Sequence, residues 1–117
     1  MKTILIVEDI DLNIDLLVQL LEDDYQLLIA KDGAQGVTLS EQHKPDLILM
    51  DISLPIMDGY EATSKIRGKF PDLPIIGLSA HAMQGDGEKA KEAGCSDYLT
   101  KPVDEDLLQE KIKKYLG

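Results

Sequence analysis

The sequence predicts a single α/β domain, a doubly wound five-stranded parallel sheet with helices on both faces. Short apolar runs alternate with amphipathic stretches along all 117 residues, and five such pairs fit the length. No linker or low-complexity segment interrupts the pattern. A chain of this length buries roughly 65% of its unfolded surface on folding, enough for one core without metal or disulfide staples. We therefore expect one domain and no intrinsic disorder.

The first two strand–helix units occupy the N-terminal third of the chain. Thr3 to Val7 has no polar interruption, which predicts a strand buried on both faces. From Leu12 to Glu22 apolar residues recur at helical spacing and predict a helix. The expected core face of this helix consists of Leu16, Leu17, Leu20 and Leu21. Tyr25 to Ala30 predicts the second strand, and Ala34 to His43 predicts a helix that stops before Pro45.

Three more strand–helix units follow. The predicted elements are a strand at Leu47 to Met50, a helix at Gly59 to Lys69, a strand at Ile75 to Ser79, a helix at Asp86 to Ala93 and a strand at Tyr98 to Thr100. Gly94 lies where glycine commonly ends a helix. Asp104 is a plausible N-cap for a last helix. The inner face of that helix should carry Leu108, Ile112, Tyr115 and Leu116.

Charge and cysteine content exclude several classes of function. The chain has 12 basic and 22 acidic residues, and its formal charge of −10 should repel nucleic acid and anionic membranes. We find no signal peptide, lipidation motif or apolar run near the ~20 residues of a membrane span. Cys95 is the one cysteine and has no base nearby, so we expect a small buried residue rather than a nucleophile. A cytoplasmic protein that binds proteins or cations fits best.

Polar residues follow four of the five predicted strands. Glu8 and Asp9 come after the first strand, Asp51 after the third, Ser79 after the fourth and Lys101 after the fifth. Because the carboxyl ends of parallel strands meet at one edge, these side chains should converge there. Three carboxylates at one edge repel each other unless a cation or a shared proton offsets their charge. Mg²⁺ suits such a set of oxygen ligands.

Asp51 is the candidate nucleophile, because it follows an apolar strand where the chain leaves the interior. A carboxylate can attack phosphorus to form an acyl phosphate while Mg²⁺, an ammonium and a hydroxyl spread the charge. Lys101 and Ser79 supply the ammonium and the hydroxyl. Repulsion among the acids should raise at least one carboxylate pKa and lower stability when metal is absent. Each residue alone could be a solvated surface group, but all five at strand ends favour a site.

The order of these residues and four local strings resemble the receiver domain of bacterial two-component response regulators. The strings are Ile6-Val7-Glu8-Asp9, Asp51-Ile52-Ser53-Leu54-Pro55-Ile56-Met57-Asp58-Gly59, Ser79-Ala80 and Lys101-Pro102. The match runs from Lys2 to Leu116. The resemblance implies a flavodoxin-like sheet with strand order 2-1-3-4-5. It also implies one receiver domain over residues 1–117, with no output domain.

The resemblance implies a phosphoacceptor and a metal site. Asp51 would accept a phosphoryl group from a phosphohistidine on a sensor histidine kinase or a histidine phosphotransfer protein. Asp9, Asp51 and the backbone carbonyl of Ser53 would hold Mg²⁺, with Glu8 acting mainly through a bound water. The acidic pair often reads Asp-Asp in this family and here reads Glu-Asp.

Other residues would respond to the phosphoryl group. The resemblance implies that Ser79 moves to hydrogen-bond this group, that Tyr98 reorients as Ser79 moves, and that Lys101 pairs with the group. The Lys101-Pro102 peptide bond would be cis. Ser53 and His81 would flank the path of an attacking water and tune hydrolysis, although His81 could instead be an exposed loop residue with no kinetic effect.

The first helix has more apolar residues than one core face needs, which predicts a docking surface. Its expected residues are Ile10, Ile14 and Val18, which repeat at i, i+4 and i+8, together with Pro102. In the resembled family the kinase or the phosphotransfer bundle binds here. The alternative is that the loop after the fifth strand covers Ile10 and Ile14.

Two classes of function remain open. In the first, the protein is a phosphorylation-switched regulator that changes its binding to a downstream protein or passes the phosphoryl group along a relay. It would not be an enzyme, although it would assist its own phosphorylation and dephosphorylation. In the second, it is a binding module that keeps the fold and takes up no phosphate. The clustered acids, hydroxyl and lysine favour the first class, because a pure binding module has no reason to tolerate such repulsion.

Overall fold

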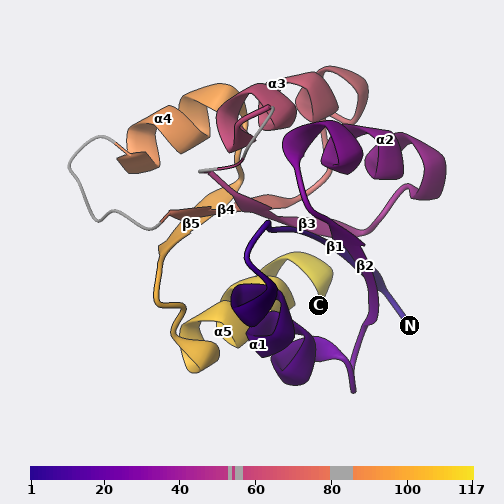
Figure 1. Cartoon of the computed structure of the whole chain (residues 1–117), viewed down its shortest axis with the longest axis vertical. Coiled ribbons are helices and arrows are strands. Elements are labelled where there is room, and N and C mark those ends of the chain that lie inside the picture. The colour runs from indigo at the N-terminus through magenta and orange to yellow at the C-terminus, as the bar shows by residue number, and fades with distance from the viewer. Residues whose placement is uncertain (53, 55–56, 80–85) are drawn as a thin grey trace.

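Five parallel strands form one sheet in the order β2-β1-β3-β4-β5, which confirms the predicted topology (Figure 1). The computed structural model describes all residues except 53, 55–56 and 80–85. The strands are β1 (Thr3–Val7), β2 (Gln26–Ala30), β3 (Leu47–Asp51), β4 (Ile75–Ser79) and β5 (Asp97–Thr100). The helices are α1 (Asp11–Leu21), α2 (Gly33–His43), α3 (Gly59–Lys69), α4 (Asp86–Ala93) and α5 (Glu105–Leu116). These bounds lie within one residue of the predicted ones.

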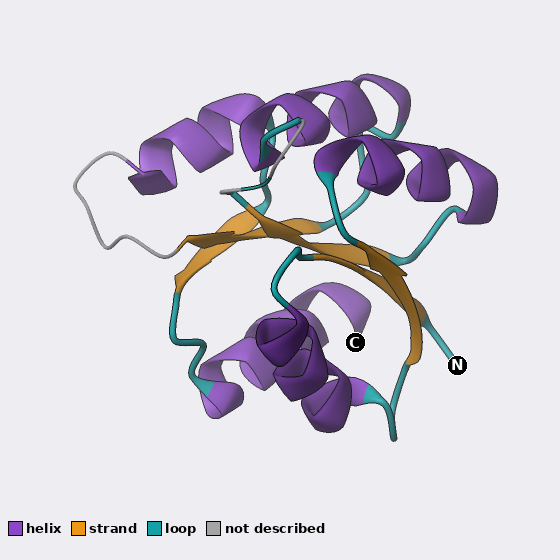
Figure 2. Ribbon diagram, viewed as in Figure 1, coloured by secondary structure: helices purple, strands orange, loops and turns teal. Residues whose placement is uncertain are grey.

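The sheet lies between two layers of helices, with α1 and α5 on one face and α2, α3 and α4 on the other (Figure 2). Alternate strand residues point to opposite faces and build two cores. The core beneath α1 and α5 includes Ile4, Ile6, Leu49, Leu78 and Ile112. The core beneath α2 to α4 includes Leu5, Val7, Met50, Ile66 and Ala90. Burial on both faces explains why the strand sequences are continuous apolar runs.

Side-chain caps and a glycine set several helix ends where the sequence predicts them. The carboxylate of Asp104 accepts a hydrogen bond from the backbone N–H of Leu107, which confirms the predicted N-cap of α5. Gly94 has φ of +116°, a conformation that glycine adopts without strain, directly after α4. Cys95 is buried as predicted, and burial raises the pKa of its thiol. No helix among the described residues is long and apolar enough to cross a membrane.

Helix α1 presents a different face to the sheet from the one the sequence predicts. Its buried residues are Ile14, Leu17 and Leu21. Leu20 packs partly against the core, but Leu16 is 52% exposed, so its predicted place on the core face is wrong. Apolar residues lie on more than one side of this helix, and contact with the sheet selects the side that contains Leu17 and Leu21.

Candidate functional site

The register of the sheet brings the predicted site residues to one edge. Val7 lies opposite Met50 in the pairing of β1 with β3, so the residues that follow both strands emerge together. Asp51 lies opposite Leu78 in the pairing of β3 with β4. The backbone N–H of Lys101 donates to the carbonyl oxygen of Ser79 at 2.6 Å, which joins the ends of β4 and β5. Glu8, Asp9, Asp51, Ser79 and Lys101 therefore share one edge, as predicted.

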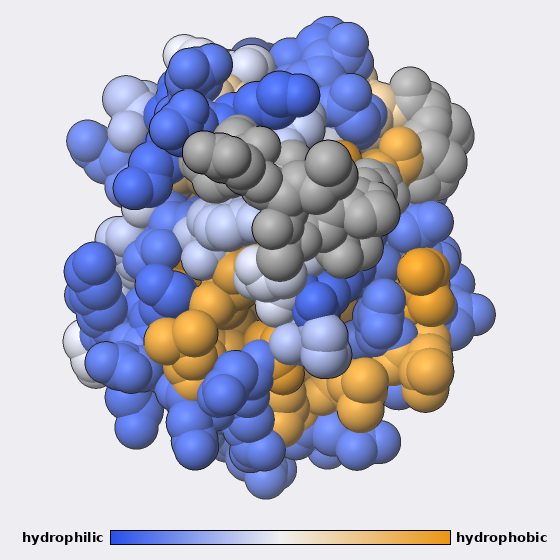
Figure 3. Space-filling view, turned by 90° about the vertical axis from the view of Figure 1, so that its left-hand side faces the viewer, coloured by the Kyte–Doolittle hydropathy of each residue, from blue (hydrophilic) through white to orange (hydrophobic). Residues whose placement is uncertain are grey.

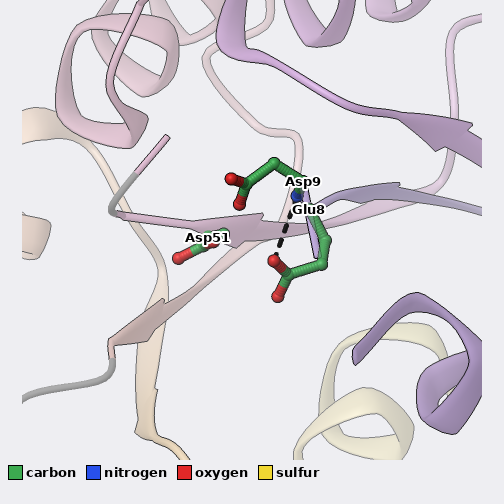
Figure 4. Close-up of side chains that lie close together, drawn as sticks. All are labelled: Glu8, Asp9 and Asp51. Atoms are coloured by element: carbon green, nitrogen blue, oxygen red, sulfur yellow. Dashed lines mark hydrogen bonds between the residues drawn. The ribbon is translucent and has the colours of Figure 1, made fainter. Parts of the chain in front are cut away.

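Three carboxylates meet at the ends of β1 and β3. One carboxylate oxygen from each of Glu8, Asp9 and Asp51 can be chosen so that the three atoms lie within 4.8 Å of one another. Figure 4 shows that the Asp9 side chain lies on one side of the strand end and the Glu8 side chain on the other, with Asp51 beside them. Glu8 and Asp51 are buried, so solvent screens their charges weakly. The cluster is stable only where positive charge offsets it.

Lys101 supplies part of that positive charge. Its Nζ lies 2.6 Å from Oε1 of Glu8, whose side chain is fully buried, and 3.4 Å from Oδ2 of Asp51. The other Glu8 oxygen accepts a hydrogen bond from the backbone N–H of Asp9, the dashed line in Figure 4, and one from the backbone N–H of Ile10. Both oxygens of Glu8 are therefore engaged within the protein.

The pKa of Glu8 shows how far Lys101 compensates for burial. Burial alone would raise this pKa. The hydrogen bonds with Lys101, with the N–H of Ile10 and with the Asp51 side chain, together with the Lys101 charge, outweigh it. The pKa of Glu8 therefore lies below its ordinary value, so Glu8 is not the carboxylate whose pKa repulsion was expected to raise. The expectation did not include the ion pair, because side-chain distances are not visible in a sequence.

Asp9 differs from Glu8 in its partners. Its Oδ1 atom is buried, and no hydrogen-bond donor among the described residues reaches it. A buried acceptor without a donor is destabilising unless an ion or water satisfies it. The donor set consists of carboxylate oxygens, the ligands that Mg²⁺ prefers. The residues at this edge therefore fit a hard divalent cation.

Chain-wide similarity identifies the family. The family model for the response regulator receiver domain matches residues 4–113. The chain belongs to this receiver domain family. It is 39% identical over 119 residues to the polar-differentiation response regulator DivK of Brucella anthropi, covering 99% of this chain and 97% of that protein.

Solved receiver domains share the fold of this receiver domain. That of the sensor histidine kinase PA1611 from Pseudomonas aeruginosa, with a magnesium ion in its active site cleft, has a TM-score of 0.92 and 39% identity over 99% of this chain and 98% of that one. That of Ssk1 from Saccharomyces cerevisiae, in complex with the histidine phosphotransfer protein Ypd1, has a TM-score of 0.91 and 33% identity, over 97% and 88%.

The remaining predicted residues of this receiver domain are placed as follows. Ser79 is buried at the end of β4, and Tyr98 is partly buried on the neighbouring β5 against the core beneath α2 to α4. The Lys101-Pro102 peptide bond is cis, which confirms the prediction. Ser53 and His81 lie outside the described residues, so their predicted roles remain predictions.

The predicted docking stripe is wrong for two of its residues. Ile10 is 52% exposed, but Ile14 is buried, and Val18 packs partly against the core beneath α1 and α5. The exposed apolar residues of α1 are Leu12 and Leu16, at 68% and 52% exposure. These two repeat at i and i+4, a signal that the sequence contained; the prediction placed Leu16 on the core face and gave Leu12 no role.

Proposed function

We propose that this receiver domain is a phosphorylation-switched regulator in which Asp51 accepts a phosphoryl group from a phosphohistidine. The donor is a sensor histidine kinase or a histidine phosphotransfer protein. One observation carries the proposal: the buried carboxylate of Asp51 lies at the end of a strand, beside two other carboxylates and 3.4 Å from Lys101 Nζ. This arrangement supports nucleophilic attack on phosphorus better than it supports hydrolysis of a bound substrate.

The chain's own residues have separate tasks in the proposed transfer. An oxygen of Asp51 forms a bond to phosphorus as the bond between phosphorus and the donor imidazole breaks, and the imidazole keeps the electron pair. Lys101, now paired with Glu8 and Asp51, is close enough to hold the negative charge of the transferred group. Ser79 and Tyr98, on adjacent strands, would then adopt the phosphorylated arrangement that changes binding to a downstream protein.

Mg²⁺ completes the proposed site. Asp9 and Asp51 would hold it directly together with the carbonyl of Ser53, and the buried unpartnered Oδ1 of Asp9 supports this assignment. Glu8 would act through water, because both of its oxygens already have partners. When bound, the ion offsets negative charge on the carboxylates and on the phosphoryl oxygens.

Acetyl phosphate provides a direct test of this function. We expect the wild-type protein to gain the mass of one phosphoryl group when it is incubated with acetyl phosphate and Mg²⁺, and to gain none in EDTA. Intact-mass spectrometry at successive times measures both. A protein that stays unmodified with Mg²⁺ present would instead be a binding module that keeps the fold without phosphorylation.

The Asp9→Asn variant tests the metal site through stability. Without metal, removing this charge relieves repulsion with Asp51, so we expect the free energy of unfolding to rise by about 1 kcal/mol. Mg²⁺ binds the assembled site and should raise the melting temperature of the wild type much more than that of the variant. Calorimetry with EDTA and with Mg²⁺ measures both effects. An Asp9→Asn variant that is less stable in EDTA, or equally stabilised by Mg²⁺, would contradict the assignment.

We propose that the phosphodonor protein docks over a pocket between α1 and the segment that joins β5 to α5. The pocket has a volume of about 280 Å³. Its apolar lining consists of Leu16, Leu17, Leu20, Leu78, Pro102 and Val103. Glu8 and Lys101 also line it, so it adjoins the phosphorylation site. Figure 3 shows hydrophobic surface gathered on the lower half of this side of the molecule, at the level of α1 and α5.

Exposed residues around this pocket indicate the chemistry of the donor surface. Leu12 of α1 and Leu107 of α5 are exposed apolar residues on the two helices, and Ile10 directly before α1 is also exposed. Asp15 and Glu105 are exposed acids on the same two helices. A donor helix with an apolar side chain flanked by basic residues would match this surface. The Ssk1 receiver bound to Ypd1 supports a partner of the phosphotransfer class.

A charge at Leu16 should separate docking from chemistry. Leu16→Glu places a carboxylate in the wall of the apolar pocket, so we expect phosphoryl transfer from a phosphorylated histidine phosphotransfer protein to slow by about tenfold or more. Labelling by acetyl phosphate should stay at the wild-type rate. Thr38→Glu is the matched control, because Thr38 is exposed on α2, on the opposite face of the sheet. This variant should leave both rates unchanged. Equal slowing of both reactions by Leu16→Glu would show that the substitution disturbs the fold rather than docking.

A further inference from the structure

The first residue of α2 touches the backbone of the loop that follows Asp51. A Cβ atom built on Gly33 would lie 2.1 Å from the carbonyl oxygen of Met57 and 2.9 Å from its carbonyl carbon. Ordinary contacts between carbon and oxygen are about 3.3 Å or longer, so any side chain here requires a shift of roughly 1 Å. The obstacle is backbone, which cannot rotate away as a side-chain tip can.

Gly33 is needed for space and not for its backbone conformation. Positive φ values among the described residues occur at Lys44, Gly94 and Gly117, so an L residue could adopt the backbone of Gly33. In a helix, alanine is favoured over glycine by about 1 kcal/mol. That preference applies to helix interiors and Gly33 is the first residue of α2, so the contact with Met57 explains the glycine.

The other end of the same loop is held by a second close contact. A Cβ on Gly59 would lie 2.3 Å from the carbonyl oxygen of Asp51 and 2.6 Å from the Cα of Ile52. The N–H of Gly59 donates to the carbonyl oxygen of Ile52 at 3.0 Å. Ile52, at the start of this loop, therefore lies against Gly59, and Met57, near its end, lies against Gly33.

The start of α2 is less free to yield than a loop. The side chain of Asp32 accepts a hydrogen bond from the N–H of Gln35, and the side chain of Gln35 accepts one from the N–H of Lys31. Gly36, one turn further on, already lies against Val7 of β1, where a Cβ would be 3.0 Å from a Val7 methyl carbon. Helix α2 is therefore anchored to the sheet, and a side chain at Gly33 would displace Met57 and its loop.

We propose that Gly33 is a positioning residue for phosphorylation, which seats the Met57 carbonyl and so places the loop after Asp51. This inference rests on the proposed function, because the same loop contains Ser53, the residue whose carbonyl is proposed to bind Mg²⁺. Gly33 itself touches neither the phosphoryl group nor the ion. Its substitution should weaken Mg²⁺ binding and slow labelling while the sheet and its cores remain intact.

Gly33→Ala tests this inference against Gly68→Ala. Gly68 lies in α3, and a Cβ there would meet nothing within 4 Å, so this control adds the same methyl group without a clash. We expect Gly33→Ala to require about tenfold more Mg²⁺ for half-maximal labelling by acetyl phosphate, in line with the loss of a group that orients metal ligands. The rise in melting temperature with Mg²⁺ should shrink in parallel, and Gly68→Ala should match the wild type in both.

A second pair of variants tests the inference if Gly33→Ala does not fold. The double variant Gly33→Ala/Met57→Gly is then compared with Met57→Gly alone. Glycine at position 57 lets the carbonyl turn away from the added methyl group, so the double variant should fold. It should bind Mg²⁺ more weakly than Met57→Gly. Wild-type affinity for Mg²⁺ in a folded Gly33→Ala protein, or equal affinities in the second pair, would overturn the inference. Failure of the wild type to label would refute the proposed function, and the Mg²⁺ dependence of melting would still test Gly33.

Discussion

Asp51→Asn is expected to take up no phosphoryl group from acetyl phosphate under conditions that label the wild type fully. The asparagine amide has nearly the shape of the carboxylate, so the buried site at the end of β3 should keep its packing. Its oxygen is neutral and is a poor nucleophile toward phosphorus, and no acyl phosphate can form at an amide. Intact-mass spectrometry of both proteins, in the same Mg²⁺ buffer, measures the loss.

Asp58→Asn is the matched control for Asp51→Asn. Asp58 is exposed at the end of the same loop, and its side chain caps α3 by accepting from the N–H of Glu61. Asparagine caps helices about as well as aspartate, so this variant should fold and label like the wild type. Labelling of Asp51→Asn at the wild-type rate would show that another residue is the acceptor.

Lys101→Met should lower the free energy of unfolding in EDTA by about 3 kcal/mol, as expected when a buried ion pair loses one partner. Lys101 Nζ lies 2.6 Å from Oε1 of the fully buried Glu8, and its side chain is only 16% exposed. Methionine preserves much of the apolar stem but leaves the buried Glu8 carboxylate without the ammonium that offsets its charge. Urea unfolding monitored by circular dichroism measures the change.

A double-variant cycle separates the ion pair from general packing. Glu8→Gln removes the buried charge, so Lys101→Met/Glu8→Gln should recover most of the stability that Lys101→Met loses. A double variant as unstable as the sum of the two single variants would show that the pair contributes little. Labelling by acetyl phosphate should stay slow in the double variant, because the ammonium that faces Asp51 is still absent.

The pH dependence of the same variants has a definite sign. In the wild type the lowered pKa of Glu8 contributes stability above its ordinary pKa, and this is lost as pH falls. In Lys101→Met the ammonium is gone and burial raises the pKa of Glu8, so its penalty grows as pH rises through that value. The stability gap between the two proteins should therefore narrow between about pH 7 and about pH 4. A gap that is constant over this range would contradict the role given to Glu8.

The sequence was sufficient for the fold and for the convergence of the site. Short continuous apolar runs such as Leu47–Met50 are typical of strands covered on both faces, and parallel strands separated by helices have their carboxyl ends at one edge. Asp51 and Lys101, far apart in the chain, could be placed together on that basis alone. The strand order came from the family resemblance, which the structure confirms.

Tertiary structure decided which side of α1 is buried, how the acids divide their tasks, and why Gly33 is glycine. Helical spacing allows several apolar faces, and only contact with the sheet buries Leu17 and Leu21 and leaves Leu16 exposed. Glu8 and Asp9 are adjacent acids in the sequence, yet one is paired with Lys101 and the other has a buried oxygen without a donor. Nothing in the sequence explains the glycine at position 33, whereas the structure places the carbonyl of Met57 against it. The spacing of apolar residues predicts the secondary structure of each segment. These three features depend instead on distances between segments, which only the folded chain determines.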